Sequence, residues 1–322
     1  MSRGADRYEG ILVLGAPRSG TTLLRRLLDA HPNIACPAET NVFTACGRFL
    51  RCERTADGVG IGVLDGLGYA GFSREEILGR LRELAFSFHR EYAARQGKQR
   101  WASKTAFDIF YLTEIEALCG DSCAFVCIQR HGADVACSIQ ELCEKNGGYL
   151  QELHTYVVRY PMVLEAFAHA WVDLATAVHE FAARHPHNAL VVKYEELTAD
   201  PNGTMTKIMG FLGERWDLQW TEQALASRDG VGLGDWKTYG RSSVDAVSVG
   251  RWKKLPRHTI SQLARICNPT LQLCGYQPLP ASVEEPPEVI RRRYQLGLLL
   301  QKLKAGGEPA VSSKENPEPH KK

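Results

Sequence analysis

The sequence lacks an excess of charge of either sign. Its 322 residues include 39 Lys and Arg against 37 Asp and Glu, which leaves a formal net charge of +2. A protein dedicated to nucleic acids usually carries a strong basic excess, because it neutralises a row of phosphates. The composition therefore argues against a nucleic-acid partner, while small local sites for anions remain compatible with it.

Long apolar segments are also missing. Residues 1–7 contain no apolar run, and the apolar run at 11–14 is far shorter than the roughly 20 residues that a membrane-spanning helix needs. We therefore expect no transmembrane segment and a cytoplasmic location.

A disulfide framework is the third absence. The ten cysteines show no paired spacing, and several fall in apolar segments, such as Cys123 and Cys127 on one face of an expected strand. This pattern predicts buried free thiols.

The most informative segment that is present covers residues 15–22, Gly-Ala-Pro-Arg-Ser-Gly-Thr-Thr, between the apolar run and an amphipathic segment. Strand, glycine-bearing turn and helix start together form a cradle for an anion, because turn N–H groups and the helix N-terminus attract negative charge. The lysine that a nucleoside-triphosphate P-loop carries after Gly20 is replaced by Thr21, and Arg18 lies inside the turn instead. The turn therefore predicts an anion site that relies on arginine.

A second segment agrees with this prediction. The apolar strand expected at 124–129 ends in Arg130 and His131, where positive charge suits an anion and repels a magnesium ion. Ser138 lies about two helical turns farther along, so that Arg130 and Ser138 can grip one phosphate. The two segments favour a nucleotide bound by arginines without a metal.

Together these segments resemble the 5′-phosphosulfate loop and the 3′-phosphate motif, Arg-x-x-x-Asp-x-x-x-Ser, of sulfotransferases that use 3′-phosphoadenosine 5′-phosphosulfate (PAPS). The resemblance extends over roughly residues 10–277. It implies an α/β fold of three layers, α/β/α, with a central parallel sheet and a P-loop-like phosphosulfate-binding loop.

The resemblance also implies a donor site with two further parts, a strand that ends in Tyr-Glu and a C-terminal loop. The implied donor-binding residues are Arg18, Ser19, Gly20, Thr21, Thr22, Arg130, Ser138, Tyr194, Arg251, Trp252 and Lys253. Residues 234–237 offer a second string similar to the C-terminal loop, and we prefer the later one because a helix-like segment follows it.

The sequence is most similar to the tyrosylprotein branch and to bacterial sulfotransferases, and Glu39 falls where that branch carries its catalytic glutamate. A short strand at 34–36, expected beside the first strand, ends at the sheet edge where ligands bind, which also favours Glu39 as a general base. By resemblance, Lys104 approaches the leaving-group oxygen with Ser242 as its partner, and Arg18 stabilises charge on the transferred group.

The segments divide the chain into a single domain at 1–285 and a tail at 286–322, predicted as a basic helix followed by a disordered end. The tail is a candidate for docking a partner. Residues 41–100 form an insertion that, together with 147–161, is expected to bind the acceptor. Other helices are predicted at 131–144, 162–184, 202–212 and 258–274.

We therefore expect a PAPS-dependent sulfotransferase that moves the sulfuryl group to a hydroxyl by in-line displacement, without a metal. The hydroxyl belongs to a small molecule, a glycan, a lipid, a carrier-bound metabolite or a tyrosine. One alternative is a P-loop nucleotide phosphotransferase, which Thr21 disfavours. The other is a non-catalytic nucleotide-binding interaction module, which has no need of Glu39.

Overall fold

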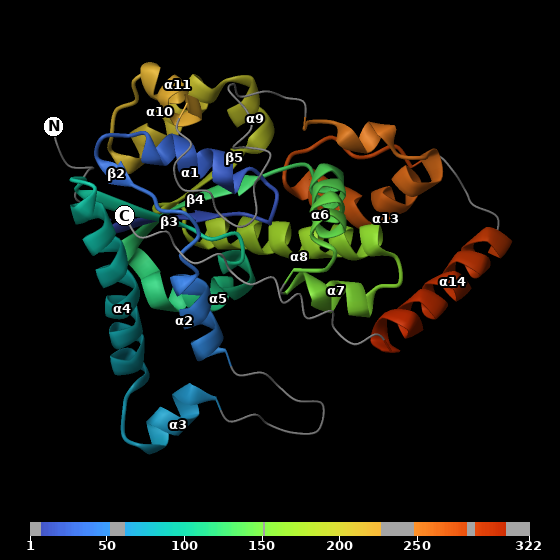
Figure 1. The fold of residues 1–322 in the computed structure, drawn as a ribbon, viewed down its shortest axis with the longest axis horizontal. Coiled ribbons are helices and arrows are strands. Elements are labelled where there is room, and N and C mark those ends of the chain that lie inside the picture. The colour runs from blue at the N-terminus through green and yellow to red at the C-terminus, as the bar shows by residue number, and fades with distance from the viewer. Residues whose placement is uncertain (1–7, 52–61, 151, 227–247, 282–286, 307–322) are drawn as a thin grey trace.

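The computed structural model describes residues 8–51, 62–150, 152–226, 248–281 and 287–306 (Figure 1). Its centre is one five-stranded sheet in which all paired strands run parallel, in the order β2-β3-β1-β4-β5. The strands are β1 (Gly10–Leu14), β2 (Ile34–Ala35), β3 (Arg100–Lys104), β4 (Cys123–Gln129) and β5 (Ala189–Lys193).

Helices cover both faces of this sheet (Figure 1). One face packs against α1 (Thr21–Asp29), α9 (Tyr194–Ala199), α10 (Pro201–Leu212) and α11 (Gln219–Ala226). The other packs against α4 (Arg74–Arg95), α5 (Leu112–Cys119), α6 (Gly132–Asn146), α8 (Val163–Arg184) and α13 (Arg257–Leu273). The predicted fold class, three α/β/α layers with a parallel sheet, is confirmed.

The apolar run of β1 explains why both faces are covered. Leu12 and Leu14 belong to the core beneath α8, whereas Ile11 and Val13 belong to the core beneath α1. Successive side chains of a strand point to opposite faces, so a strand that is apolar at every position must be covered on both sides.

The expectation that the short strand at 34–36 lies directly beside the first strand is wrong. β2 pairs with β3, Ile34 opposite Arg100, and β3 lies between β2 and β1. β3 was not predicted from the sequence, because this strand begins with Arg100 and ends with Lys104 although all five of its residues are buried. Arg100 is tolerated there because its Nη1 donates to the carbonyl oxygen of Leu212 at 2.7 Å.

The insertion at 41–100 contains α2 (Val42–Leu50), α3 (Val63–Tyr69) and α4. At the start of α4, Ser73 Oγ accepts the Glu76 N–H at 3.2 Å while Glu76 Oε2 accepts the Ser73 N–H at 2.8 Å. This reciprocal cap stabilises the beginning of a 22-residue helix. In Figure 1, α3 and the adjacent end of α4 extend away from the sheet.

Near the C-terminus, α14 (Pro287–Gly306) forms where the basic helix was predicted. Gly297 lets it approach the chain before α8 closely, since a Cβ there would lie 2.4 Å from Pro161. Its apolar side chains Tyr294, Leu296 and Leu299 are exposed. Residues 307–322, predicted as disordered, lie outside the described residues, and the domain boundary at 285 stays a prediction.

The remaining described elements are α7 (Leu153–Arg159) and the short 3₁₀ turns η1 (Asp108–Tyr111), η2 (Gly120–Ser122) and η3 (Arg251–Lys254). Among the helices that the structure describes, none combines the length and apolar character needed to cross the hydrocarbon core of a bilayer. The nine described cysteines have free thiols, and all but Cys137 are buried, as predicted.

Candidate functional site

The turn between β1 and α1 has the backbone of an anion cradle. Arg18 has φ of 70° and Gly20, the residue before α1, has φ of 95°. A left-handed conformation costs a non-glycine residue about 1–3 kcal/mol and persists where surrounding contacts hold it, often at functional sites. Gly20 is needed for space as well, because a Cβ would lie 2.2 Å from the Tyr194 ring. The tight turn leaves the N-terminal N–H groups of α1 facing the cradle.

Several buried polar atoms in this region have no hydrogen-bond partner among the described residues. Among them are Ser19 Oγ and Arg130 Nε, and these two residues are 1% and 4% exposed. A buried polar group without a partner costs stability, and such groups occur where a ligand completes the network. The pair therefore fits an anionic ligand at the turn.

Arg130, the residue after β4, joins the two segments that the sequence predicts to bind phosphate. Its Nη1 donates to the Arg18 carbonyl oxygen at 2.8 Å, and its guanidinium carbon lies 4.6 Å from the centroid of the Tyr194 ring. Burial lowers the pKa of the Arg130 guanidinium, against the opposing effect of Tyr194, Asp134 and Glu195. A guanidinium that is poorly solvated is stabilised by an anion such as phosphate.

Ser138, on α6, accepts a hydrogen bond from Arg18 Nε at 3.2 Å. The structure thus brings Arg18, Arg130, Ser138 and Tyr194 together, although Ser138 meets Arg18 rather than Arg130 directly. Thr21 and Thr22 are buried in the first turn of α1. These residues belong to the set that the sequence predicts to bind the donor, and that role stays a prediction.

The sequence reasoning missed Asp134, the central residue of the second motif. Its Oδ2 accepts the Gly250 N–H at 2.7 Å and its Oδ1 accepts the Trp252 N–H at 3.1 Å. Arg130 Nη2 also donates to the Ser248 carbonyl oxygen. Asp134 therefore holds the C-terminal loop against the start of α6. The motif shows the aspartate, but nothing in the sequence reveals a partner more than a hundred residues away.

The three predicted loop residues take different positions. The Trp252 ring stacks on His131, with centroids 5.7 Å apart and planes at 13°. The Arg251 guanidinium pairs with Glu141 on α6, and Lys253 is exposed. The alternative string at 234–237 lies outside the described residues, as does Ser242, so the prediction for Ser242 stays untested.

Glu39 and Lys104 meet beside the cradle. Lys104 Nζ donates to Glu39 Oε1 at 2.5 Å and to Thr22 Oγ1 at 2.9 Å. Lys104 comes from the end of β3, and Glu39 from the loop after β2, so the two neighbouring parallel strands deliver both groups to one edge. The carboxylate thereby lies next to the first turn of α1.

The chain from residue 10 to residue 218 matches a family model described as the sulfotransferase family. This chain belongs to the sulfotransferase family. The predicted family and the predicted enzyme class, a sulfotransferase, are confirmed.

Two relatives of this sulfotransferase are protein-tyrosine sulfotransferases by name. A putative one from Caenorhabditis briggsae is 24% identical over 224 residues, which cover 69% of this chain and 70% of the relative. Protein-tyrosine sulfotransferase A of Caenorhabditis elegans is 26% identical over 213 residues, covering 64% of this chain and 50% of the relative. The chain therefore spans only half the length of the second relative.

Among solved structures, the sulfotransferase domain from the curacin biosynthetic pathway superposes with a TM-score of 0.58 at 18% identity. The superposition covers 85% of this chain and 100% of that domain. At this level of identity the likeness supports the fold.

Behind the Glu39 loop of the sulfotransferase lies a fully buried carboxyl that the sequence did not single out. Asp108 Oδ1 accepts the Thr44 hydroxyl at 2.6 Å. Burial raises the pKa of Asp108 to about 7, and the nearby Glu39 charge adds to the rise. Because it lies in an apolar-looking stretch, 106–112, no local pattern marks it.

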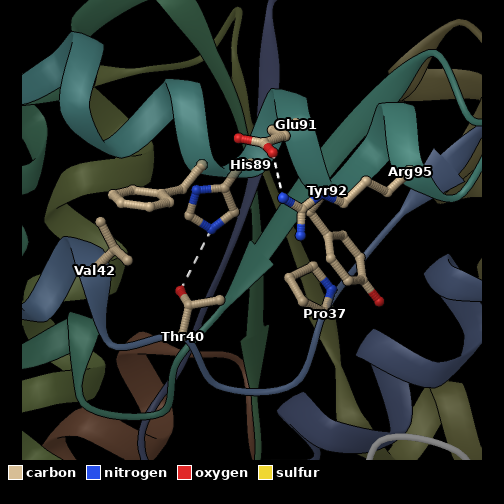
Figure 2. Close-up of a pocket in the computed structure, with 8 residues that line it drawn as sticks. Pro37, Thr40, Val42, His89, Glu91, Tyr92 and Arg95 are labelled. Atoms are coloured by element: carbon tan, nitrogen blue, oxygen red, sulfur yellow. Dashed lines mark hydrogen bonds and ion pairs between the residues drawn. The ribbon is translucent and has the colours of Figure 1, made fainter. Parts of the chain in front are cut away.

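A pocket of about 340 Å³ lies between the Glu39 loop and α4 (Figure 2). Pro37 and Thr40, which flank Glu39 in the loop, face side chains that come from α4. The lining residues are Pro37, Thr40, Val42, Phe88, His89, Glu91, Tyr92 and Arg95.

Proposed function

We propose that this sulfotransferase uses PAPS as donor and a hydroxyl-bearing molecule as acceptor, with Glu39 as general base. The observation that carries the donor proposal is the pair of buried, unpartnered atoms Ser19 Oγ and Arg130 Nε beside the N-terminus of α1. Ser19, Gly20, Thr21 and Thr22 would hold the 5′-phosphosulfate, and Arg130 and Ser138 the 3′-phosphate. Tyr194, Arg251, Trp252 and Lys253 complete the proposed donor-binding set.

PAPS supplies a sulfuryl group whose transfer forms a bond between sulfur and the acceptor oxygen and breaks the bond between sulfur and the phosphate oxygen. Glu39 accepts the proton that leaves the acceptor hydroxyl, an effect worth about 10²- to 10⁴-fold. Arg18 lies in the turn where its guanidinium meets growing negative charge. Lys104 Nζ orients the Glu39 carboxylate through their 2.5 Å contact. It also donates to Thr22 Oγ1, and from there it approaches the leaving oxygen.

The acceptor class stays broad in this proposal. Small molecules, glycans, lipids, carrier-bound metabolites and tyrosine all offer a hydroxyl, and the names of the two nematode relatives favour a phenolic one. Ser242, the cytoplasmic location, a reaction without a metal and a docking partner for the C-terminal segment stay predictions.

Two other functions make different predictions. A nucleotide phosphotransferase would turn over ATP in a Mg²⁺-dependent way, and family membership and Thr21 both disfavour it. A non-catalytic nucleotide-binding module would bind without transferring a group to any acceptor.

The donor proposal is tested by calorimetry with 3′,5′-bisphosphoadenosine (PAP) and AMP. PAP should bind much more tightly than AMP, because only PAP offers a 3′-phosphate to Arg130. Arg130→Ala should reduce the ratio of the two affinities by about ten- to a hundredfold, since a charge-assisted contact is worth about 1.5–3 kcal/mol.

Arg184→Ala is the matched control. It removes a guanidinium of similar size that pairs with Glu116 at the surface, so it should leave the affinity ratio unchanged. Arg130→Lys guards against a folding defect, because it keeps the charge. Equal affinities of the unmodified protein for PAP and AMP would overturn the donor proposal.

A further inference from the structure

The lining of the pocket between the Glu39 loop and α4 carries no net charge (Figure 2). Its only charged lining residues, Glu91 and Arg95, pair with each other one turn apart on α4. The others are Pro37, Val42, Phe88, Tyr92, His89 and Thr40, which present mainly carbon. Such a surface suits an uncharged, flat or bulky apolar group, because burying a charge there would be unfavourable.

His89 gives the pocket a specific polar atom. The residue is 1% exposed, and its Nδ1 lies 2.7 Å from the Ala85 carbonyl oxygen. A carbonyl oxygen only accepts, so Nδ1 must carry the proton. Burial lowers the pKa of His89, which keeps the imidazole neutral at pH 7. Nε2 is then an unprotonated acceptor.

This acceptor is poorly satisfied within the protein. Its one described partner is the Thr40 hydroxyl at 3.4 Å, well beyond the usual length of a hydrogen bond from a hydroxyl. Figure 2 shows Nε2 directed across the pocket at Thr40. The Phe43 and Trp101 rings lie 5.3 and 5.1 Å from the imidazole and fix its plane. A ligand N–H or O–H could therefore improve the pairing.

We infer that this pocket binds the body of the acceptor, an uncharged ring that carries a second hydrogen-bond donor besides the hydroxyl that is sulfated. The second donor pairs with His89 Nε2, and the ring lies against Tyr92, Val42 and Pro37. Glu39 is not itself a lining residue, but it stands between Pro37 and Thr40 in the loop that forms one wall, and the inference requires that the first hydroxyl is presented to it there. The inference rests on the proposed function, because it makes His89 a specificity-determining residue for that reaction.

Binding to the protein without PAPS is tested first, with 2,7-dihydroxynaphthalene and with 2-naphthol, which lacks the second hydroxyl. A hydrogen bond contributes about 0.5–1.5 kcal/mol, so 2,7-dihydroxynaphthalene should bind about two- to tenfold more tightly, beyond the twofold that its two equivalent hydroxyls explain. In long-range ¹H–¹⁵N spectra, 2,7-dihydroxynaphthalene should shift the His89 Nε2 resonance more than 2-naphthol does. Equal affinities together with an unmoved resonance would overturn the inference without any variant.

Transfer is tested next, with PAPS and 2,7-dihydroxynaphthalene compared with 2-naphthol. The dihydroxy compound should have the lower KM by more than the twofold that its two equivalent hydroxyls explain. His89→Phe keeps a ring of similar shape and removes the acceptor atom, so it should abolish that KM advantage and leave the KM values of the two compounds within about twofold of each other.

His258→Phe is the control, since this exposed histidine of α13 lines a separate groove. Thermal melts check that each variant folds. A KM advantage that survives in a folded His89→Phe protein would overturn the inference. Failure of PAP to bind in parallel calorimetry would instead overturn the proposed function, so the two failures are distinguishable.

Discussion

The proposed donor side and the proposed acceptor side of the site are built differently. The donor side joins three distant parts of the chain, the turn after β1, the start of α6 and the loop at η3, through hydrogen bonds of buried charged groups such as Arg130 and Asp134. The proposed acceptor side combines the loop around Glu39 with the insertion that follows it, and its pocket is lined mostly by carbon atoms. Binding a polyanion demands particular residue types at fixed places, whereas binding an apolar body demands mainly shape.

Glu39→Gln should separate the two sides most clearly. Glutamine keeps the size and the hydrogen bond from Lys104 but cannot take the acceptor proton, so turnover should fall by about 10²-fold or more while PAP affinity is kept. Single-turnover transfer and calorimetry measure the two quantities.

Glu91→Gln, which removes an exposed carboxylate that pairs with Arg95 on α4, is the matched control and should retain most activity. If Glu39→Gln also retained near-normal transfer, the base would have to be sought elsewhere, with His131 next in line.

Asp134→Ala tests whether the donor side depends on its loop. Removing the carboxylate leaves the N–H groups of Gly250 and Trp252 without their partner, so the loop should detach and PAP affinity should fall by about tenfold.

Glu141→Ala breaks the partly exposed pair with Arg251 in the same loop. Surface ion pairs contribute about 0–1 kcal/mol, so its effect on PAP affinity should be several times smaller. Equal effects of the two variants in calorimetry would show that Asp134 has no special role in the loop.

Asp108→Asn should change PAP affinity least of these variants. It should instead change how the free energy of unfolding depends on pH. Because burial raises the pKa of Asp108 to about 7 in the folded protein, folding favours its protonated form. The stability contributed by this group is complete below about pH 4, the pKa range of an unfolded aspartate, and is lost as pH rises through about 7.

The amide still accepts the Thr44 hydroxyl but does not ionise. The variant should therefore lose part of the decrease in unfolding free energy between pH 5 and pH 8, measured by urea titration. Asp121→Asn, at an exposed position in η2, should leave the pH dependence intact. An unchanged pH dependence in Asp108→Asn would mean that Asp108 ionises as an ordinary carboxyl.

The donor side was largely predictable from the sequence, and the contrast above explains why. Arg18, Ser19 and Gly20 stand together in the chain, and Arg130 and Ser138 are related by helical spacing, so local patterns show their chemistry. Asp134 was visible, but its role was not, because its partners Gly250 and Trp252 lie 116 and 118 residues farther along the chain.

The acceptor side was less predictable. Glu39 was placed on the correct edge of the sheet, yet the strand before it pairs with β3 and not with β1. β3 was missed because a buried strand that begins with Arg100 and ends with Lys104 lacks the apolar pattern of a strand. His89 appears in the sequence only as a member of a helix, and its tautomer follows from contacts that no pattern encodes.

The position of the insertion in the sheet has an evolutionary consequence. Residues 41–100 leave the fold after β2 and return at β3, and these strands are already joined, since the Arg100 N–H donates to the Asn33 carbonyl oxygen at 2.9 Å. The cost of closing a loop grows only slowly with its length, so a part of this segment that adds nothing to the core can be lengthened or replaced at little cost. Among the described residues that part is α3, which has no buried residue, whereas α2 and α4 contribute Phe43 and Phe86 to the core. Changes at α3 can therefore accumulate while every strand keeps its register.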